Sequence, residues 1–313
     1  MNKKLKLYII LTVSVGMLLW WAVLFFTTTR EQQVNYWWQV AMGVSALLFS
    51  CIGIITAAKW SWLKSGVGRS IFFISLGLMM WGLGQLGWSY YLFAQPGTEA
   101  VPSHIPDYIY FSALPLWFIG ILTLSRATGA RYGIKKTSGK LAVILIAAVM
   151  SFLSYYILVD VARGGASYFT NQAVLDTFFD LGYSIGDAIL LTIVIAVYAL
   201  SWKRLGGRFK RPVVTILTGF IFLFLADFSY SYTNGKGIYY NGNIADLFFF
   251  LMVATFGLGV AMLDPDHIRK LKKVTAIPAN DVTSSPISTS SLHENVVAPY
   301  AHPHDNTPTK DQD

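Results

Sequence analysis

The chain contains one cysteine and few charged residues. Its only cysteine, Cys51, lies in the middle of an apolar run, so an intrachain disulfide is excluded and no thiol chemistry is indicated. Charged residues make up 13% of the chain, about half the roughly 25% typical of a soluble domain, while 54% of the residues are hydrophobic. This composition predicts a membrane protein rather than a soluble one.

Sequence patterns that mark catalytic sites are also missing. Neither H-E-x-x-H nor G-x-S-x-G occurs, and His104 has no second histidine before residue 264 with which it could pair. We therefore expect a protein that is not an enzyme and carries no cofactor. A G-x-G-x-x-G pattern at residues 82–87 lies inside an apolar run, whereas a dinucleotide site needs a strand before it. We interpret Gly77, Gly84 and Gly87 as glycines of helix packing.

Long apolar runs, in contrast, are abundant. Eight of them approach the roughly 20 residues that a helix needs to cross about 30 Å of hydrocarbon. They cover residues 7–26, 36–58, 70–93, 108–124, 141–158, 178–200, 213–232 and 244–263. The sequence therefore predicts an all-α fold, in which residues 1–263 form a polytopic bundle of eight transmembrane helices.

The charges between these runs separate by sign. Before residue 264, alternate loops hold 16 basic residues, and the loops between them hold three. All nine acidic residues of this region fall in the basic-poor loops or in the neighbouring parts of helices. The positive-inside rule predicts a cell-membrane protein with both termini in the cytoplasm. Because inner loops that face anionic lipids explain the net charge of +8, nucleic acid is not an expected partner.

The sequence after residue 263 is polar. Residues 264–273 form a basic juxtamembrane segment, and we expect Arg269, Lys270, Lys272 and Lys273 to contact anionic lipids. Residues 274–313 are rich in Ser, Thr, Asn and Pro and hold too little apolar surface to fold, so they are predicted to be a disordered cytoplasmic tail. We interpret the His-Pro-His at 302–304 as part of this solvated tail and not as a metal site.

Four aspartates lie toward the outer side of the predicted bundle. Asp107 and Asp246 stand at the starts of their helices, where capping accounts for a carboxylate. At a rise of 1.5 Å per residue, Asp187 and Asp227 lie roughly 20 Å from the inner helix ends, inside the hydrocarbon and at matched height. A carboxyl group at that depth must face the bundle interior or a wet cavity.

The role of the two deep aspartates has two interpretations. Asp187 and Asp227 could share a proton or a cation across a common cavity, which would make them functional. They could instead form structural hydrogen bonds with Ser184, Ser229 or Tyr183. The sequence leaves both interpretations open.

Other polar-tipped residues lie near these aspartates. We expect a polar, acidic pocket that takes a small or cationic ligand from outside. Its candidate residues are the four aspartates together with Tyr183, Trp88, Gln85 and His104. His104 precedes Asp107 by three residues and could act as its pH-sensitive neighbour.

Three fragments resemble a family of eight-helix bacterial membrane sensor regions. Residues 102–111, P-S-H-I-P-D-Y-I-Y-F, are similar to that family's P-S-x-x-D-x-x-Y-L signature. Residues 182–187, G-Y-S-I-G-D, are similar to its Y-x-x-x-D. Ala226-Asp227, followed by residues 237–239 and Asp246, is similar to its A-D…G-x-Y…D. The resemblance covers roughly residues 70–263.

This resemblance implies a sensor. Such regions are commonly fused to diguanylate cyclase (GGDEF), EAL phosphodiesterase or histidine kinase domains. Here no output domain follows residue 263, so a signal would leave through a cytoplasmic or membrane partner protein or through the inner loops. We expect a receptor or sensor. The alternative is a proton- or cation-coupled secondary transporter in which Asp187 and Asp227 carry the ion.

Overall fold

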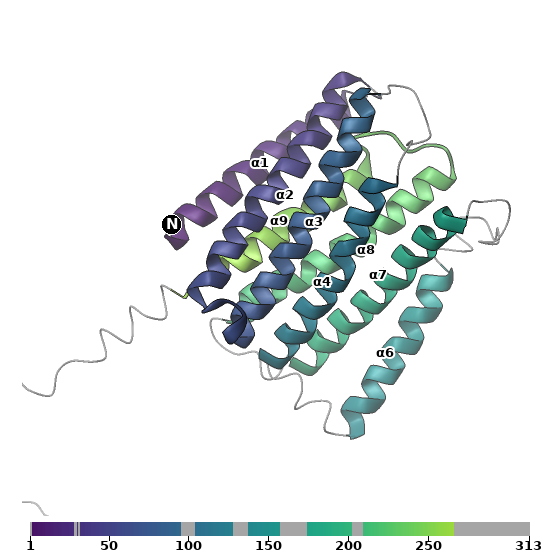
Figure 1. Ribbon diagram of the computed structural model, residues 1–313. Helices are drawn as coiled ribbons and strands as arrows, with labels where there is room; N and C mark the ends of the chain where they lie inside the picture. The colour runs from purple at the N-terminus through teal and green to yellow at the C-terminus, as the bar shows by residue number, and fades with distance from the viewer. Residues whose placement is uncertain are drawn as a thin grey trace, which may run out of the picture. The chain divides into compact units, whose positions relative to one another are not determined.

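The computed structural model is helical throughout the residues that it describes, and these contain no strand (Figure 1). The described residues are 2–27, 30, 32–94, 104–127, 137–156, 174–201 and 209–265. All of them belong to one compact unit, Met1–Arg269, and the second unit, Lys270–Asp313, lies outside the described part. The predicted all-α class is confirmed.

The described part of the chain contains eight α-helices and one short 3-10 helix, η1 (Trp62–Lys64). The α-helices are α1 (Lys3–Phe26), α2 (Gln33–Lys59), α3 (Gly66–Ala94), α4 (Ile105–Ala127), α6 (Thr137–Tyr155), α7 (Val174–Ser201), α8 (Lys210–Gly235) and α9 (Ile244–Met262). Each overlaps one predicted apolar run, and most begin a few residues before it. α1, for example, begins at Lys3 instead of residue 7, because the Asn2 side chain accepts a hydrogen bond from the backbone N–H of Leu5 at 2.9 Å and caps the helix.

Six of the described helices are long and apolar enough to cross a membrane: α1, α2, α3, α4, α8 and α9. The other two, α6 and α7, contain shorter apolar stretches at Thr137–Phe152 and Ile185–Leu200. The chain is thus a multi-pass helical protein of membrane type. That all eight helices cross the membrane stays a prediction.

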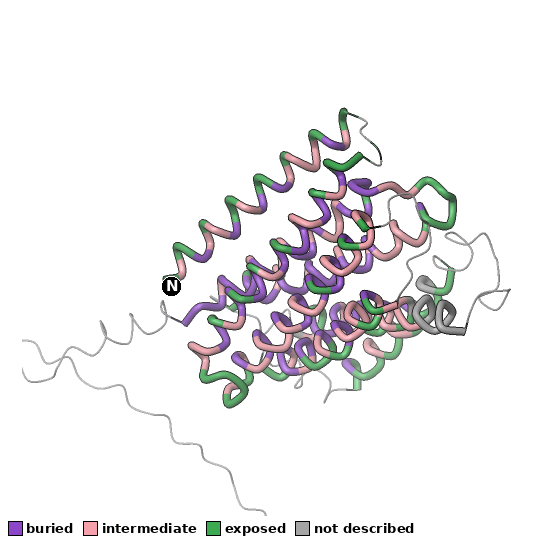
Figure 2. Tube along the Cα trace, turned by 45° about the horizontal axis from the view of Figure 1, so that its top comes forward, coloured by how far each residue is buried: buried purple, intermediate pink, exposed green. Residues whose placement is uncertain are grey.

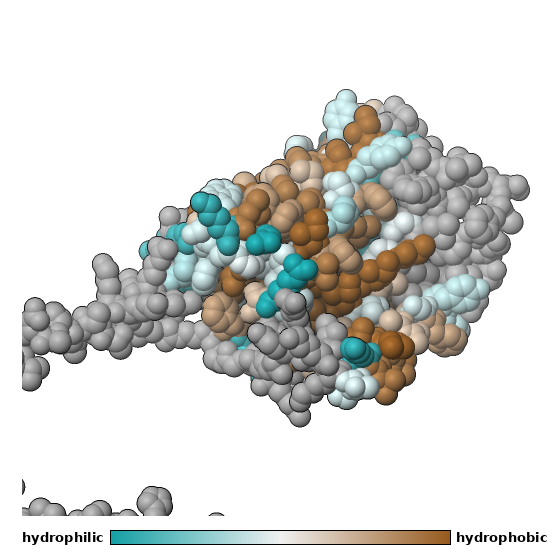
Figure 3. Space-filling model, turned by 60° about the horizontal axis from the view of Figure 1, so that its bottom comes forward, coloured by the Kyte–Doolittle hydropathy of each residue, from teal (hydrophilic) through white to brown (hydrophobic). Residues whose placement is uncertain are grey.

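Large apolar side chains cover the surface of the described helices (Figure 3). On α1, exposed and buried positions alternate with the helical period, so that one side faces the bundle and the other faces outward (Figure 2). The outward side includes Leu11, Val15, Leu19 and Val23, which are 47%, 54%, 64% and 60% exposed. A contiguous apolar face of this kind is unusual on a protein in water but suits contact with lipid.

The bundle is a closed ring of helices with one helix added on each of two sides. Around the ring each helix packs against the next, in the order α2, α3, α4, α7, α8 and α9. α9 in turn packs against α2, which closes the ring. α1 packs outside the ring against α2 and α9, and α6 packs outside it against α7 (Figure 1). The ring therefore has an interior to which six of the described helices contribute.

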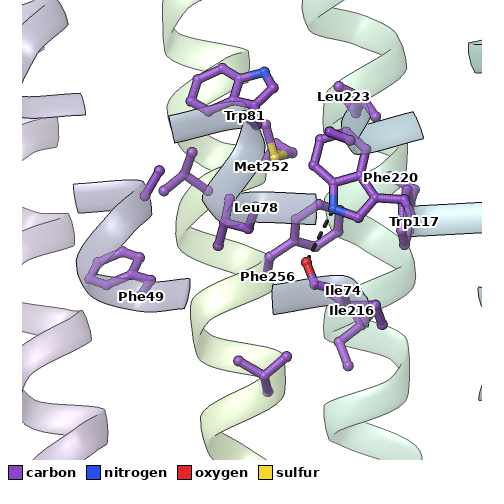
Figure 4. Close-up of a cluster of buried hydrophobic side chains, with 14 of the residues drawn as sticks. Phe49, Ile74, Leu78, Trp81, Trp117, Ile216, Phe220, Leu223, Met252 and Phe256 are labelled. Atoms are coloured by element: carbon purple, nitrogen blue, oxygen red, sulfur yellow. Dashed lines mark hydrogen bonds between the residues drawn. The ribbon is translucent and has the colours of Figure 1, made fainter. Parts of the chain in front are cut away.

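Aromatic side chains fill the middle of this interior. Phe220 and Phe256 have ring centroids 4.6 Å apart, and Trp117 lies 5.5 Å from Phe256. The indole N–H of Trp117 is buried and donates to the backbone carbonyl of Ile74 at 3.2 Å, which ties α4 to α3 (Figure 4). Because the hydrocarbon of a membrane offers no hydrogen-bond partner, a polar group such as this indole N–H must find its partner within the protein.

Glycines on α3 allow α4 to approach closely. A Cβ placed on Gly77 would lie 2.5 Å from the Trp117 ring, and one on Gly84 would lie 2.8 Å from the Tyr110 ring. A Cβ on Gly87 would lie 3.4 Å from Pro106. All three neighbours belong to α4, so the interpretation of these glycines as helix-packing residues is confirmed.

A buried ion cluster joins three helices at the opposite end of the bundle from the starts of α2, α4 and α9. The Lys6 ammonium donates to the Asp264 carboxylate at 2.6 Å and to the Thr56 hydroxyl at 2.7 Å, and the side chains of Lys6 and Asp264 are both fully buried. Lys59 adds a second contact with Asp264 at 3.1 Å. Lys6 lies near the start of α1, and Asp264 supplies the counter-charge for its buried ammonium group.

Several predictions concern residues outside the described part. These include the lipid contacts of Arg269, Lys270, Lys272 and Lys273, the disordered tail at 274–313, and the three histidines of that tail. They stay predictions.

Candidate ligand-binding site

A cavity of about 190 Å³ lies inside the ring of helices, toward the end at which α2, α4 and α9 begin. Its described lining comes from all six ring helices and from Tyr239 in the loop between α8 and α9. The lining residues are Gln39, Trp81, Gln85, Trp88, Asp107, Tyr110, Leu114, Trp117, Tyr183, Asp187, Leu223, Asp227, Tyr230, Ser231, Tyr239, Asp246 and Phe249. Trp81, Trp117 and Leu223 also belong to the apolar cluster in Figure 4, so the cavity adjoins the aromatic core.

One wall of the cavity is a fixed polar network that ends on Asp246. This carboxylate is 2% exposed and accepts hydrogen bonds from the Gln39 side-chain amide at 2.6 Å, the Gly242 backbone N–H at 2.6 Å and the Tyr239 hydroxyl at 3.2 Å. Gly242 has a φ of +91°, a conformation in which a side chain would be strained. The capping interpretation of Asp246 was incomplete, because Asn243 is the N-cap of α9 and Asp246 instead binds across to α2.

The network continues from Gln39 through two further helices. The Gln39 side-chain oxygen accepts from the Gln85 amide at 2.6 Å, and the Gln85 oxygen accepts from the Tyr110 hydroxyl at 2.5 Å. In each of these hydrogen bonds the donor belongs to the residue farther from Asp246 along the network. The hydrogen bonds therefore all run toward Asp246, and they link α4, α3, α2 and α9. Gly84 makes this possible, because the Tyr110 ring lies where its side chain would be.

The loop residue Tyr239 is held in its donor form. Burial raises the pKa of the Tyr239 hydroxyl well above its ordinary value, and the nearby negative charge of Asp246 acts in the same direction. Tyr239 therefore keeps its proton for the hydrogen bond to Asp246 at any physiological pH.

The opposite wall holds the carboxyl pair of Asp187 on α7 and Asp227 on α8. Asp187 is only 4% exposed, and its carboxyl group lies close to that of Asp227. One oxygen of Asp187, Oδ1, is buried and has no hydrogen-bond partner. Both aspartates line the cavity. That they share a proton or a cation stays a prediction, and so does the alternative of structural hydrogen bonds with Ser184, Ser229 or Tyr183.

The remaining predicted residues lie at the rim of the cavity or just behind it. Asp107, in the first turn of α4, lines the cavity and contacts His104 Nδ1 at 3.2 Å, so the expected neighbour relation is confirmed. His104 itself is not among the lining residues. The Tyr183 hydroxyl donates to the backbone carbonyl of Asp107 at 2.9 Å and thereby ties α7 to α4.

Sequence reasoning missed several residues that line the cavity, and three of them are polar partners in the network. Gln39, Tyr110 and Tyr239 all belong to the Asp246 network. Gln39 carried a usable signal, because a single amide inside a long apolar run needs a partner within the membrane. Tyr110 and Tyr239 had no comparable signal, since tyrosines near helix ends usually indicate an interfacial belt. The exposed Tyr90 and Tyr155 are consistent with such a belt.

Comparison of the chain with family models, with curated proteins and with solved structures finds no match.

The geometry defines what the cavity can do. One wall is internally satisfied and rigid, while the other presents paired carboxyl groups and a buried oxygen without a partner. Among the described lining residues there is no lysine, arginine or histidine. The described residues also contain no cluster of three or more metal-binding side chains. The site is suited to binding a small molecule by charge and aromatic contact.

Proposed function

We propose that this chain is an integral membrane receptor that binds a small molecule in the acidic, aromatic cavity inside its helix ring. The observation that carries the proposal is the unpartnered carboxylate oxygen of Asp187, which lines that cavity. Leaving such a group without a partner costs roughly 1–3 kcal/mol, so a fold that keeps it has a use for it. A ligand that donates to this oxygen would remove the cost.

Charge asymmetry and the sequence resemblance support the rest of the proposal. The alternation of basic loops favours an orientation with both termini in the cytoplasm, and in this orientation the cavity opens toward the outer side of the membrane. The short fragments around Asp107, Asp187 and Asp227 are similar to those of membrane sensor regions. The signal would pass to a partner protein on the cytoplasmic side.

Ligand binding would reach several helices at once. Because the cavity is lined by all six ring helices, a ligand that draws Asp187 and Asp227 together changes the packing of α7 and α8 against their neighbours. A receptor needs this differential contact to shift its conformational equilibrium.

Filling the cavity without changing its charge tests the proposal. Leu223 lines the cavity, whereas Ile221, two residues earlier on α8, is 42% exposed on the outer surface. We expect native mass spectrometry of protein purified in mild detergent to show a retained small molecule on the wild type and on Ile221→Trp. Leu223→Trp should lose it. Equal retention by both variants, or none by the wild type, would count against a ligand cavity.

The second candidate is a proton- or cation-coupled transporter, and the carboxyl pair favours it. Two adjacent carboxyl groups that share one proton can exchange it for a cation, which is a common coupling device. Proteoliposomes that contain a pH-sensitive dye distinguish the two functions. A transporter should acidify or alkalinise the lumen when the retained compound is added outside, whereas a receptor should leave the lumenal pH unchanged.

A further inference from the structure

The cavity has a definite size, charge and wall chemistry, and together these restrict its ligand. From them we infer that the site takes a small organic ammonium ion with an apolar or aromatic body, whose charged nitrogen lies at the Asp187–Asp227 pair. This inference rests on the proposed function, because it names the class of ligand for the same cavity.

The charge argument starts from the two walls. Both oxygens of Asp246 are occupied by donors from Gln39, Gly242 and Tyr239, so this carboxylate has little left to offer a ligand. The carboxyl pair on the opposite wall is different, because Asp187 Oδ1 is buried without a partner. A donor that carries positive charge satisfies this oxygen and compensates the two carboxyl groups in one step.

The size argument excludes large ligands. An apolar cavity of about 150 Å³ holds one benzene molecule, so the present cavity of about 190 Å³ suits a molecule of about eight non-hydrogen atoms. A peptide, a nucleotide or a lipid headgroup with its chains would not fit in this space.

The residues that line the cavity do not suit a bare metal ion. Calcium takes six to eight oxygen ligands and magnesium demands six, and the described residues contain no group of three or more His, Cys, Asp or Glu side chains that could hold a metal ion. Eight of the lining residues are aromatic instead: Trp81, Trp88, Tyr110, Trp117, Tyr183, Tyr230, Tyr239 and Phe249. Aromatic faces attract an organic cation and also cover its apolar part.

Two probes of equal size separate charge from shape. Benzylammonium and benzyl alcohol both have eight non-hydrogen atoms, and only the first is charged at neutral pH. We expect equilibrium dialysis with the purified full-length protein to show that benzylammonium binds about tenfold to a hundredfold more tightly than benzyl alcohol. Sodium, magnesium and calcium at the same concentrations should not displace it.

Variants locate the charged end of the probe. Asp187→Asn and Asp227→Asn keep the shape of the side chain and remove the carboxylate, so both should lose the preference for benzylammonium. Ile221→Trp should keep that preference, and thermal unfolding verifies that each variant is folded.

Three results would overturn the inference. They are equal affinity for the two probes, displacement of benzylammonium by a metal ion, and an unchanged preference in both Asn variants. The proposed function is tested separately by the retained molecule in the Leu223→Trp comparison, because a neutral ligand would still be lost there.

Discussion

Gly84 shows how one missing side chain positions the site. The Tyr110 ring occupies the space of its Cβ, and the hydroxyl of that ring is the first donor in the network that ends on Asp246. We predict that Gly84→Ala lowers the free energy of unfolding by about 1–3 kcal/mol, because the ring must shift against a packed core. It should also weaken ligand retention, since the network loses its first hydrogen bond.

Gly16 provides the matched control for this prediction. It lies on α1, and a Cβ there would have no neighbour within 4 Å. Gly16→Ala should leave stability unchanged or raise it slightly, because alanine favours the helix by about 1 kcal/mol. Thermal unfolding in detergent measures both variants, and equal transition temperatures would contradict the close packing of α3 on α4.

The deep aspartates and Gln39 differ in how far the sequence could predict them. The depth of Asp187 and Asp227 followed from counting residues, because a helix rises by a fixed amount per residue. That Gln39 would bind Asp246 could not be derived, since the contact depends on which helices are neighbours in the ring. Helix length is encoded locally, whereas helix order around a centre depends on packing between distant segments.

At the scale of the elements, the Lys6 cluster fastens α1 and α2 to the end of α9. Asp264→Leu would leave the fully buried Lys6 ammonium with only the Thr56 hydroxyl as partner. We predict a loss of about 3–5 kcal/mol in the free energy of unfolding, which is typical of an uncompensated buried charge. The double variant Lys6→Met, Asp264→Leu should lose less than Asp264→Leu alone.

The control for this cluster is Lys4→Met, because Lys4 lies two residues before Lys6 on α1 and is exposed. It should leave stability within about 0.5 kcal/mol of the wild type. Unfolding in mixed detergent micelles measures all four proteins. A double variant at least as unstable as the single variant would show that the charges of Lys6 and Asp264 do not compensate each other.

Three helical hairpins, α3–α4, α6–α7 and α8–α9, also differ at this scale. Their sequences are similar, with tyrosines at the end of one helix and an aspartate at the start of the next. In the structure α3, α4, α8 and α9 all line the cavity, while α6 lies outside the ring. Sequence similarity among hairpins could not predict this difference, because similar helices can pack against protein or against lipid.

For the whole molecule, the alternation of basic loops predicts the orientation in the membrane. In a Cys51→Ala background, single cysteines at Thr98 and Asn234 should react with an impermeant thiol reagent added to intact cells. Cysteines at Ser138 and Gly206 should react only after permeabilisation. External labelling at Ser138 would contradict the orientation and would place the cavity on the cytoplasmic side.

The central claim is that the carboxyl pair of Asp187 and Asp227 holds the ligand. Native mass spectrometry of the wild type, Asp187→Asn and Asp227→Asn, purified identically, tests it most directly. We predict that the wild type retains a small basic compound and that both Asn variants lose it, while their thermal transitions stay close to that of the wild type, because asparagine keeps the shape of aspartate and can still form hydrogen bonds. Undiminished retention of the compound in both variants would contradict the claim and leave the pair with a structural role only.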